Sequence, residues 1–159
     1  MNDAFISYAH IDDQSLSEDS RGWISQLHRA LEVRIGQLLG EDLKIWRDPQ
    51  LQRSDVFDAT LVREFLNSKV MVSVFSPRYA KSDWCRREFE EFCKNAEAGS
   101  GLRLGDKSRV FKVVKTPVNP VELPPGMKAL YETILGFEFY DLDPETGASG
   151  RATGRTDRP

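Results

Sequence analysis

The sequence has few of the residues that build metal centres and disulfide frameworks. It contains two cysteines, Cys85 and Cys93, and two histidines, His10 and His28, among 159 residues. The cysteines lie in one predicted helix, about 12 Å apart at the helical rise per residue, which is too far for a disulfide. Two thiols and two scattered imidazoles are also too few for a zinc site. We therefore expect buried or reduced thiols and no metal site.

Long apolar runs and an excess of positive charge are also missing. No apolar segment approaches the roughly 20 residues needed to span a bilayer, and the N-terminal MNDAFISYAH does not have the pattern of a secretory signal. The net charge of −3 gives no general attraction to nucleic acid or anionic lipid. We expect a cytoplasmic protein that binds neither nucleic acid nor membrane, with 40% hydrophobic residues for one compact core.

Several motifs of common α/β enzymes are absent. No GxxxxGK[ST] or GxGxxG follows a predicted strand, which argues against a P-loop and against a Rossmann dinucleotide site. Ser76, in VFSPRY, lacks the glycine-flanked turn of a serine nucleophile. The first predicted strand ends in Ser7 and Tyr8, which does not fit a phospho-accepting receiver domain. Asp12 and Asp13 lie further along and are expected to be solvated loop charges.

What the sequence does contain is an alternation of strands and helices. Short apolar runs predict strands at 3–8, 43–46, 69–76, 109–115 and 135–142. Apolar residues at helical spacing predict helices over about 23–38, 56–66, 83–98 and 127–133. This order predicts an α/β fold, a doubly wound five-stranded parallel sheet, over residues 1–142. Residues 143–159 lack core-forming side chains and are expected to be a flexible tail or a linker to a further domain.

Ligands of such sheets bind beyond the carboxyl ends of the strands, and the stretch SDWCRREFEEF (82–92) follows one of these ends. Trp84 and Glu88 lie four residues apart and share a helix face. Glu90 is expected to face water, and Glu91 is a second candidate acid. The pair has two interpretations, a packing residue beside a surface acid or an aromatic wall beside a chemically active acid, and spacing alone does not decide between them.

Together these segments resemble the Toll/interleukin receptor (TIR) domain family, particularly its bacterial and plant-like members. The resemblance rests on AFISYAHID (4–12), IWRDPQLQRSDVF (45–57) and VMVSVFSPRYAKSDWCRREF (70–89). It implies a flavodoxin-like five-stranded fold. Members act as homotypic signalling modules or cleave NAD⁺ between nicotinamide and ribose, and the resemblance favours the bacterial NAD⁺-consuming type. NAD⁺ is then a substrate, and no cofactor is expected.

The resemblance also implies a site. Glu88 is the expected catalytic acid, and the expected substrate contacts are Trp84, Tyr8, Ala9, Arg47, Asp48 and Phe57. Some of these have structural alternatives: Arg47 could pair with a nearby acid, Asp48 could bond loop backbone, and Phe57 could belong to the core. Trp46 is expected to be a core residue.

Ser54 departs from the family pattern, since many members have glycine in this loop, and glycine reaches backbone angles that serine resists. The departure bears on both assembly and closure of the site. Three functions stay open: an NAD⁺ nucleosidase or cyclase activated by self-association, a non-catalytic assembly module, or a nucleotide-binding domain without cleavage. The first would serve as a bacterial immune or cell-suicide effector whose assembly with other TIR domains is driven by a sensor domain.

Overall fold

The computed structural model describes residues 1–47, 59–99, 101, 103–104, 107–133, 136–138, 140–142 and 149–151. Its centre is a parallel five-stranded sheet in the order β2-β1-β3-β6-β7. The strands are β1 (Asn2–Ser7), β2 (Ile45–Trp46), β3 (Ser68–Phe75), β6 (Val110–Val114) and β7 (Gly136–Glu138). The predicted doubly wound α/β fold is confirmed.

The strand order places a crevice at the carboxyl edge of the sheet. From β1 the chain adds β2 on one side and then β3 on the other, so the connections leave β1 and β3 in opposite directions. In the ladder Phe5 lies opposite Met71 and Ser7 opposite Ser73, so β1 and β3 end side by side. Ligand sites of parallel sheets form at such switch points.

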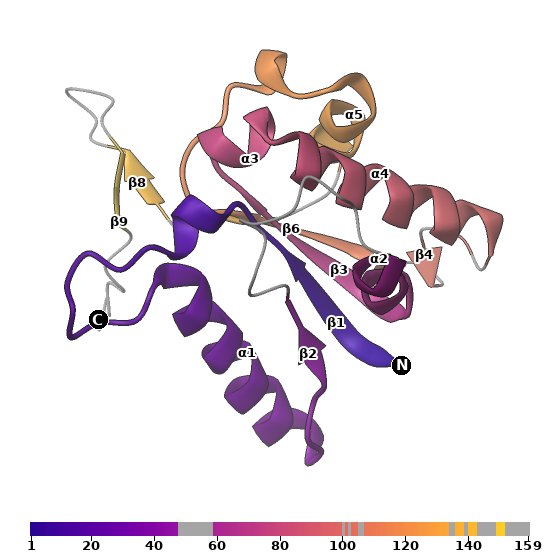
Figure 1. Cartoon of the computed structure of the whole chain (residues 1–159), viewed down its shortest axis with the longest axis horizontal. Coiled ribbons are helices and arrows are strands. Elements are labelled where there is room, and N and C mark those ends of the chain that lie inside the picture. The colour runs from indigo at the N-terminus through magenta and orange to yellow at the C-terminus, as the bar shows by residue number, and fades with distance from the viewer. Residues whose placement is uncertain are drawn as a thin grey trace, which may run out of the picture.

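Helices cover the two faces of the sheet unequally (Figure 1). Among the described helices, α1 (Trp23–Leu39) covers one face. The opposite face carries α2 (Ala59–Leu66), α3 (Pro77–Lys81), α4 (Asp83–Ala98) and α5 (Pro125–Thr133). Two short 3₁₀ helices, η1 (His10–Asp13) and η2 (Pro120–Glu122), complete the fold. No helix within the described ranges is both long enough and apolar enough to cross a membrane.

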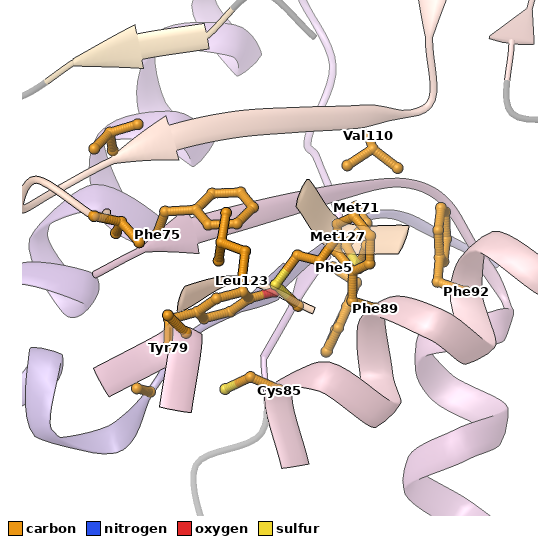
Figure 2. Packing of buried hydrophobic residues seen from close by; sticks show 14 residues of the cluster. Phe5, Met71, Phe75, Tyr79, Cys85, Phe89, Phe92, Val110, Leu123 and Met127 are labelled. Carbon is orange, nitrogen blue, oxygen red and sulfur yellow. The ribbon is translucent and has the colours of Figure 1, made fainter. Parts of the chain in front are cut away.

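Each face has its own apolar core. The larger cluster lies under α4 and α5 (Figure 2) and includes Phe5, Met71, Phe75, Tyr79, Cys85, Phe89, Phe92 and Met127. The smaller one lies under α1 and consists of Ile6, Tyr8, Ile24, Val72, Val74 and Val113. The central strand β3 contributes to both clusters, which explains its continuous apolar sequence.

The helix ends follow the sequence signals. Gly40 directly follows α1, adopts φ 70° and donates its N–H to the Gly36 carbonyl oxygen over 2.8 Å. A left-handed residue of this kind ends a helix with little strain only when it is glycine. Ser82 begins α4 by accepting a hydrogen bond from the Cys85 N–H over 3.2 Å.

The last predicted strand, 135–142, is divided in the structure. Of the described residues in this range, only Gly136–Glu138 joins the main sheet, because its neighbour β6 ends at Val114, opposite Glu138, and offers no further ladder partner. The next segment, β8 (Tyr140–Leu142), pairs antiparallel with β9 (Ser149–Arg151), which lies within the predicted tail. A second small hairpin, β4 (Arg103–Leu104) with β5 (Lys107–Ser108), precedes β6.

Candidate functional site

A pocket of about 280 Å³ lies at the switch point of the sheet. One wall is the segment that leaves β1 and continues through η1, and the other is formed by the beginnings of α3 and α4. The lining residues are Tyr8, Ala9, His10, Ile11, Gln14, Arg78, Ser82, Trp84 and Cys85. Three of the residues expected from sequence, Tyr8, Ala9 and Trp84, therefore meet in one cavity.

Two serine caps place the second wall of this pocket. Ser76 follows β3 and accepts the Tyr79 N–H over 3.1 Å, which starts α3 with Pro77 in its first turn. Ser82 does the same for α4, so Trp84 is fixed as the second residue of that helix. Caps of this kind each stabilise a helix by about 1 kcal/mol.

Glu88 lies one helical turn beyond Trp84 and is only 3% exposed, whereas Glu90 and Glu91 face solvent. The packing face of α4 therefore selects one acid out of three. Glu88 is not among the residues that line the pocket, but it lies close to one that is: burial raises the pKa of the Cys85 thiol, and the Glu88 carboxylate raises it further. Position 85 thus connects the cavity with the buried acid.

The first wall is held from inside the fold. Tyr8 is 2% exposed, packs in the smaller core and has the His10 ring edge-on at 5.5 Å between centroids. The Cys85 thiol donates to the Tyr8 carbonyl oxygen over 3.5 Å, which joins the two walls. Ala9 is 4% exposed and belongs to the larger core.

Asp12 is not the solvated loop charge that the sequence suggested. It is 9% exposed, accepts a hydrogen bond from the Ser76 hydroxyl, and has the Lys115 ammonium 3.4 Å from its other oxygen. The turn of η1 folds the chain inward over the strand ends, and a carboxylate carried there needs polar partners. Asp12 thereby joins the first wall to the ends of β3 and β6.

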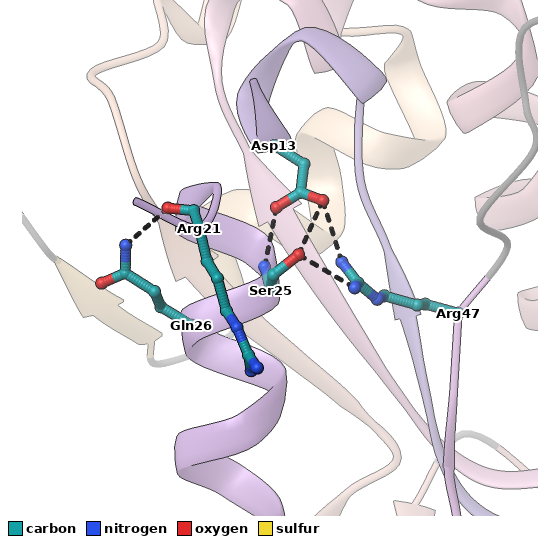
Figure 3. Close-up of polar contacts among 5 residues, drawn as sticks. All are labelled: Asp13, Arg21, Ser25, Gln26 and Arg47. Carbon is teal, nitrogen blue, oxygen red and sulfur yellow. Dashed lines mark hydrogen bonds and ion pairs between the residues drawn. The ribbon is translucent and has the colours of Figure 1, made fainter. Parts of the chain in front are cut away.

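Asp13 was also wrongly predicted to be solvated (Figure 3). Its carboxylate accepts the Ser25 N–H over 2.7 Å, the Ser25 hydroxyl over 2.9 Å and the Arg47 guanidinium over 3.1 Å. Gly22 makes this contact possible, because a Cβ there would lie 1.8 Å from the Asp13 carbonyl oxygen. The start of α1 can therefore dock on η1 only with glycine at this position.

Arg47 forms a link between elements. Besides Asp13, it donates to the Ser25 hydroxyl over 2.9 Å, and its guanidinium carbon lies 5.8 Å from the centre of the Tyr8 ring. It does not line the pocket. Asp48, Phe57 and Ser54 lie outside the described residues. Trp46 stacks on Phe5 with centroids 5.3 Å apart, in agreement with its predicted core role.

Sequence reasoning missed part of the lining, namely His10, Ile11, Gln14, Arg78, Ser82 and Cys85. A positional signal was available for some of them, since His10 and Ile11 follow the end of β1 and Arg78 follows the end of β3. Among the described residues, no group of three His, Cys, Asp or Glu side chains is placed to hold a metal ion.

Fold and site together define a doubly wound α/β domain with a switch-point pocket beside a buried glutamate. A family profile described as the TIR domain matches residues 4–104. That match covers more than half of the chain, and the protein belongs to the TIR domain family.

Solved structures show the same fold. The TIR domains of the activated Roq1 resistosome, which directly recognises the pathogen effector XopQ, are 21% identical at TM-score 0.50, and the match covers 76% of this chain and 61% of that one. The TIR domain of the Toll-related receptor TRR-2 from Hydra magnipapillata is 14% identical at TM-score 0.51, covering 87% of this chain and 85% of that one. No curated protein matches the chain.

Proposed function

We propose that this TIR domain cleaves NAD⁺ between nicotinamide and ribose, with Glu88 as the catalytic carboxylate. The observation that carries the proposal is the burial of this one carboxylate, 3% exposed, on the helix whose first turn lines the switch-point pocket. A buried acid beside a pocket is a functional candidate, because keeping a carboxylate out of water costs free energy that a packing role does not require.

The chemistry suits a single carboxylate. Glycosidases ordinarily need two, because the departing oxygen must be protonated. Nicotinamide leaves NAD⁺ as a neutral base and needs no proton. The ribose that remains carries positive charge, and a fixed carboxylate stabilises it and accepts hydrogen bonds from its hydroxyls. Trp84 supplies an apolar wall that limits water. Attack by water then gives ADP-ribose, and attack by the adenine gives a cyclic product.

We further propose that activity depends on self-association. In the single chain Glu88 lies behind the lining of the pocket rather than in it, which agrees with an acid that reaches the ribose only after neighbouring copies reposition α4. The partners are other TIR domains and a sensor that brings them together. The role of immune or cell-suicide effector is part of this proposal, and the Roq1 protein, which recognises a pathogen effector, supports it. The free cysteines support a reducing, cytoplasmic location.

Release of nicotinamide tests the proposal. Concentrated protein, with its assembly confirmed by light scattering, is incubated with NAD⁺ and the products are separated by chromatography. Nicotinamide is expected from the wild type, and Glu88→Gln should abolish it with an unchanged circular dichroism spectrum. Glu90→Gln on the same helix is the matched control and should keep full activity. An assembled wild type that leaves NAD⁺ intact, or an active Glu88→Gln variant, would overturn the assignment.

A second candidate is a non-catalytic assembly module. Two large aromatic side chains, Phe111 and Phe137, are 42% and 67% exposed on neighbouring strands at one edge of the sheet, which favours a contact surface. This candidate predicts self-association that Phe137→Ser weakens, together with no consumption of NAD⁺ at any protein concentration. The nicotinamide assay therefore separates the two functions.

A further inference from the structure

The switch-point pocket has an uneven charge. Among its described lining residues Arg78 contributes a guanidinium and His10 an imidazole, and none carries a carboxylate. The Arg78 guanidinium is a permanent positive charge, and such a charge in a concave surface attracts anionic ligands. In the substrate proposed above, the anionic part is the diphosphate that joins the two nucleosides.

Other basic side chains near this edge of the sheet already have acidic partners. The Arg47 guanidinium lies 3.1 Å from the Asp13 carboxylate, and the Lys115 ammonium lies 3.4 Å from Asp12. Arg78, in contrast, forms no ion pair with any described residue. Its charge is therefore available to a ligand, and binding one does not require an internal ion pair to break.

The backbone under Arg78 is firmly anchored. The next residue, Tyr79, is fully buried, and its hydroxyl is hydrogen-bonded to the Ser7 hydroxyl over 2.9 Å. Ser76 caps the same turn. Because Tyr79 and Ala80 point into the core, Arg78 faces outward at the pocket, where its side chain is exposed. A fixed backbone below an unpaired guanidinium is a suitable base for binding a phosphate, since two parallel N–H groups match its oxygens.

We propose that Arg78, rather than Arg47, binds the diphosphate of the dinucleotide and so selects phosphate-bearing substrates. This inference rests on the proposed function for the identity of the ligand. It adds that the pocket discriminates between nucleotides and nucleosides that share the same scissile bond.

Two substrates with one bond in common provide the test. NAD⁺ and nicotinamide riboside both release nicotinamide, but the riboside has no phosphate. Arg78→Ala should raise KM for NAD⁺ about tenfold to a hundredfold, the usual range for a lost charge-assisted hydrogen bond, with KM for the riboside unchanged. Arg78→Lys should recover part of the loss. Arg87→Ala, which removes an exposed arginine of α4 outside the lining, is the matched control and should change neither KM.

Binding of ADP-ribose, measured by calorimetry on the same variants, keeps the test independent of turnover. If the wild type binds ADP-ribose at least tenfold more tightly than Arg78→Ala but releases no nicotinamide, the diphosphate site stands and the cleavage function fails. If NAD⁺ is cleaved with the same KM by both proteins, the cleavage function stands and the Arg78 assignment is overturned. Absence of ADP-ribose binding to the wild type would also overturn it.

Discussion

The two faces of the sheet differ in the size of their buried apolar clusters. Within the described ranges, the face under α4 and α5 buries a cluster of 14 residues, with several aromatic rings in mutual contact. The face under α1 buries six described residues, and α1 itself contributes only Ile24, while Leu38 near its end is 83% exposed. The well-packed face is the one that carries Glu88. Dense packing therefore fixes where α4 holds this carboxylate in the single chain, and this is the position that the proposed assembly would have to change.

The largest expected effect comes from opening the well-packed face. Phe89 is 2% exposed and sits next to Glu88 in sequence. Phe89→Ala should lower the free energy of unfolding by about 3 to 5 kcal/mol, because it leaves a cavity in a core that cannot collapse. Leu38→Ala on α1 should change it by less than about 0.5 kcal/mol. Urea unfolding of both variants measures the two changes in the free energy of unfolding. Equal changes would show that the packing at Phe89 and at Leu38 does not differ.

The second largest loss of stability is expected from removing the Asp12 carboxylate, which joins the first wall of the pocket to the ends of β3 and β6. Removing the Asp12 carboxylate with Asp12→Ala leaves the Ser76 hydroxyl and the Lys115 ammonium without their partner. We expect a loss of about 2 to 3 kcal/mol, the range for hydrogen bonds to a largely buried charge. The control is Asp83→Ala, because Asp83 is 88% exposed and 3.4 Å from Arg86, and exposed pairs contribute little. An unfolding temperature that does not change in Asp12→Ala would contradict a structural role for the Asp12 carboxylate.

A smaller loss is expected where α1 meets η1. Gly22→Ala places a Cβ within 1.8 Å of a backbone oxygen of Asp13, so the helix must shift, at a cost of about 1 to 3 kcal/mol. Gly126→Ala in α5 is the matched control: nothing lies within 4 Å of its Cβ position, and alanine favours a helix by up to about 1 kcal/mol. The denaturant concentration at the midpoint of unfolding should therefore fall for Gly22→Ala and rise for Gly126→Ala.

The smallest effect concerns the thiols of α4 at alkaline pH. Burial, with the nearby Glu97 and Glu90 charges, raises the pKa of Cys93 from 9.0 to about 12, and burial raises that of Cys85 as well. The neutral, partly buried Cys93 thiol contributes stability that is complete below pH 9 and is lost as the pH rises toward 12, because the unfolded chain ionises first. Stability measured from pH 8 to 10.5 should fall less in the Cys93→Ala variant than in the wild type. Alkylation of the folded protein at pH 8 should be slow, and rapid labelling would contradict the raised pKa values.

Local patterns predicted the elements that depend on neighbours in sequence. The apolar run of β3 and the exposure of Glu90 on α4 both follow from spacing of a few residues, whereas spacing alone does not predict the burial of Glu88. The network around Asp12 and Asp13 could not be found in this way. Its partners, Ser76 and Lys115 for one and Ser25 and Arg47 for the other, are distant in sequence and meet only after the sheet has formed.

The site shows the same limit. The resemblance to TIR domains pointed to Tyr8, Ala9 and Trp84, and the structure places all three around one pocket. Their role as substrate contacts stays a prediction. Arg78 went unnoticed, since nothing in the letters around it separates a ligand-binding arginine from a solvated one. Arg47 and Lys115 have acidic partners, whereas Arg78 forms no ion pair with any described residue. This difference can be seen only in the folded structure.

The edge strands of the sheet bear on the self-association that we propose for this domain. β2 spans two residues and β7 three, so each rim of the sheet offers few unpaired backbone groups to a neighbouring molecule. Short edge strands disfavour the strand-by-strand pairing between molecules that leads to amyloid-like aggregates. Contacts between copies are then expected to form through side chains rather than through strand pairing. Such contacts favour reversible, ordered assembly over aggregation.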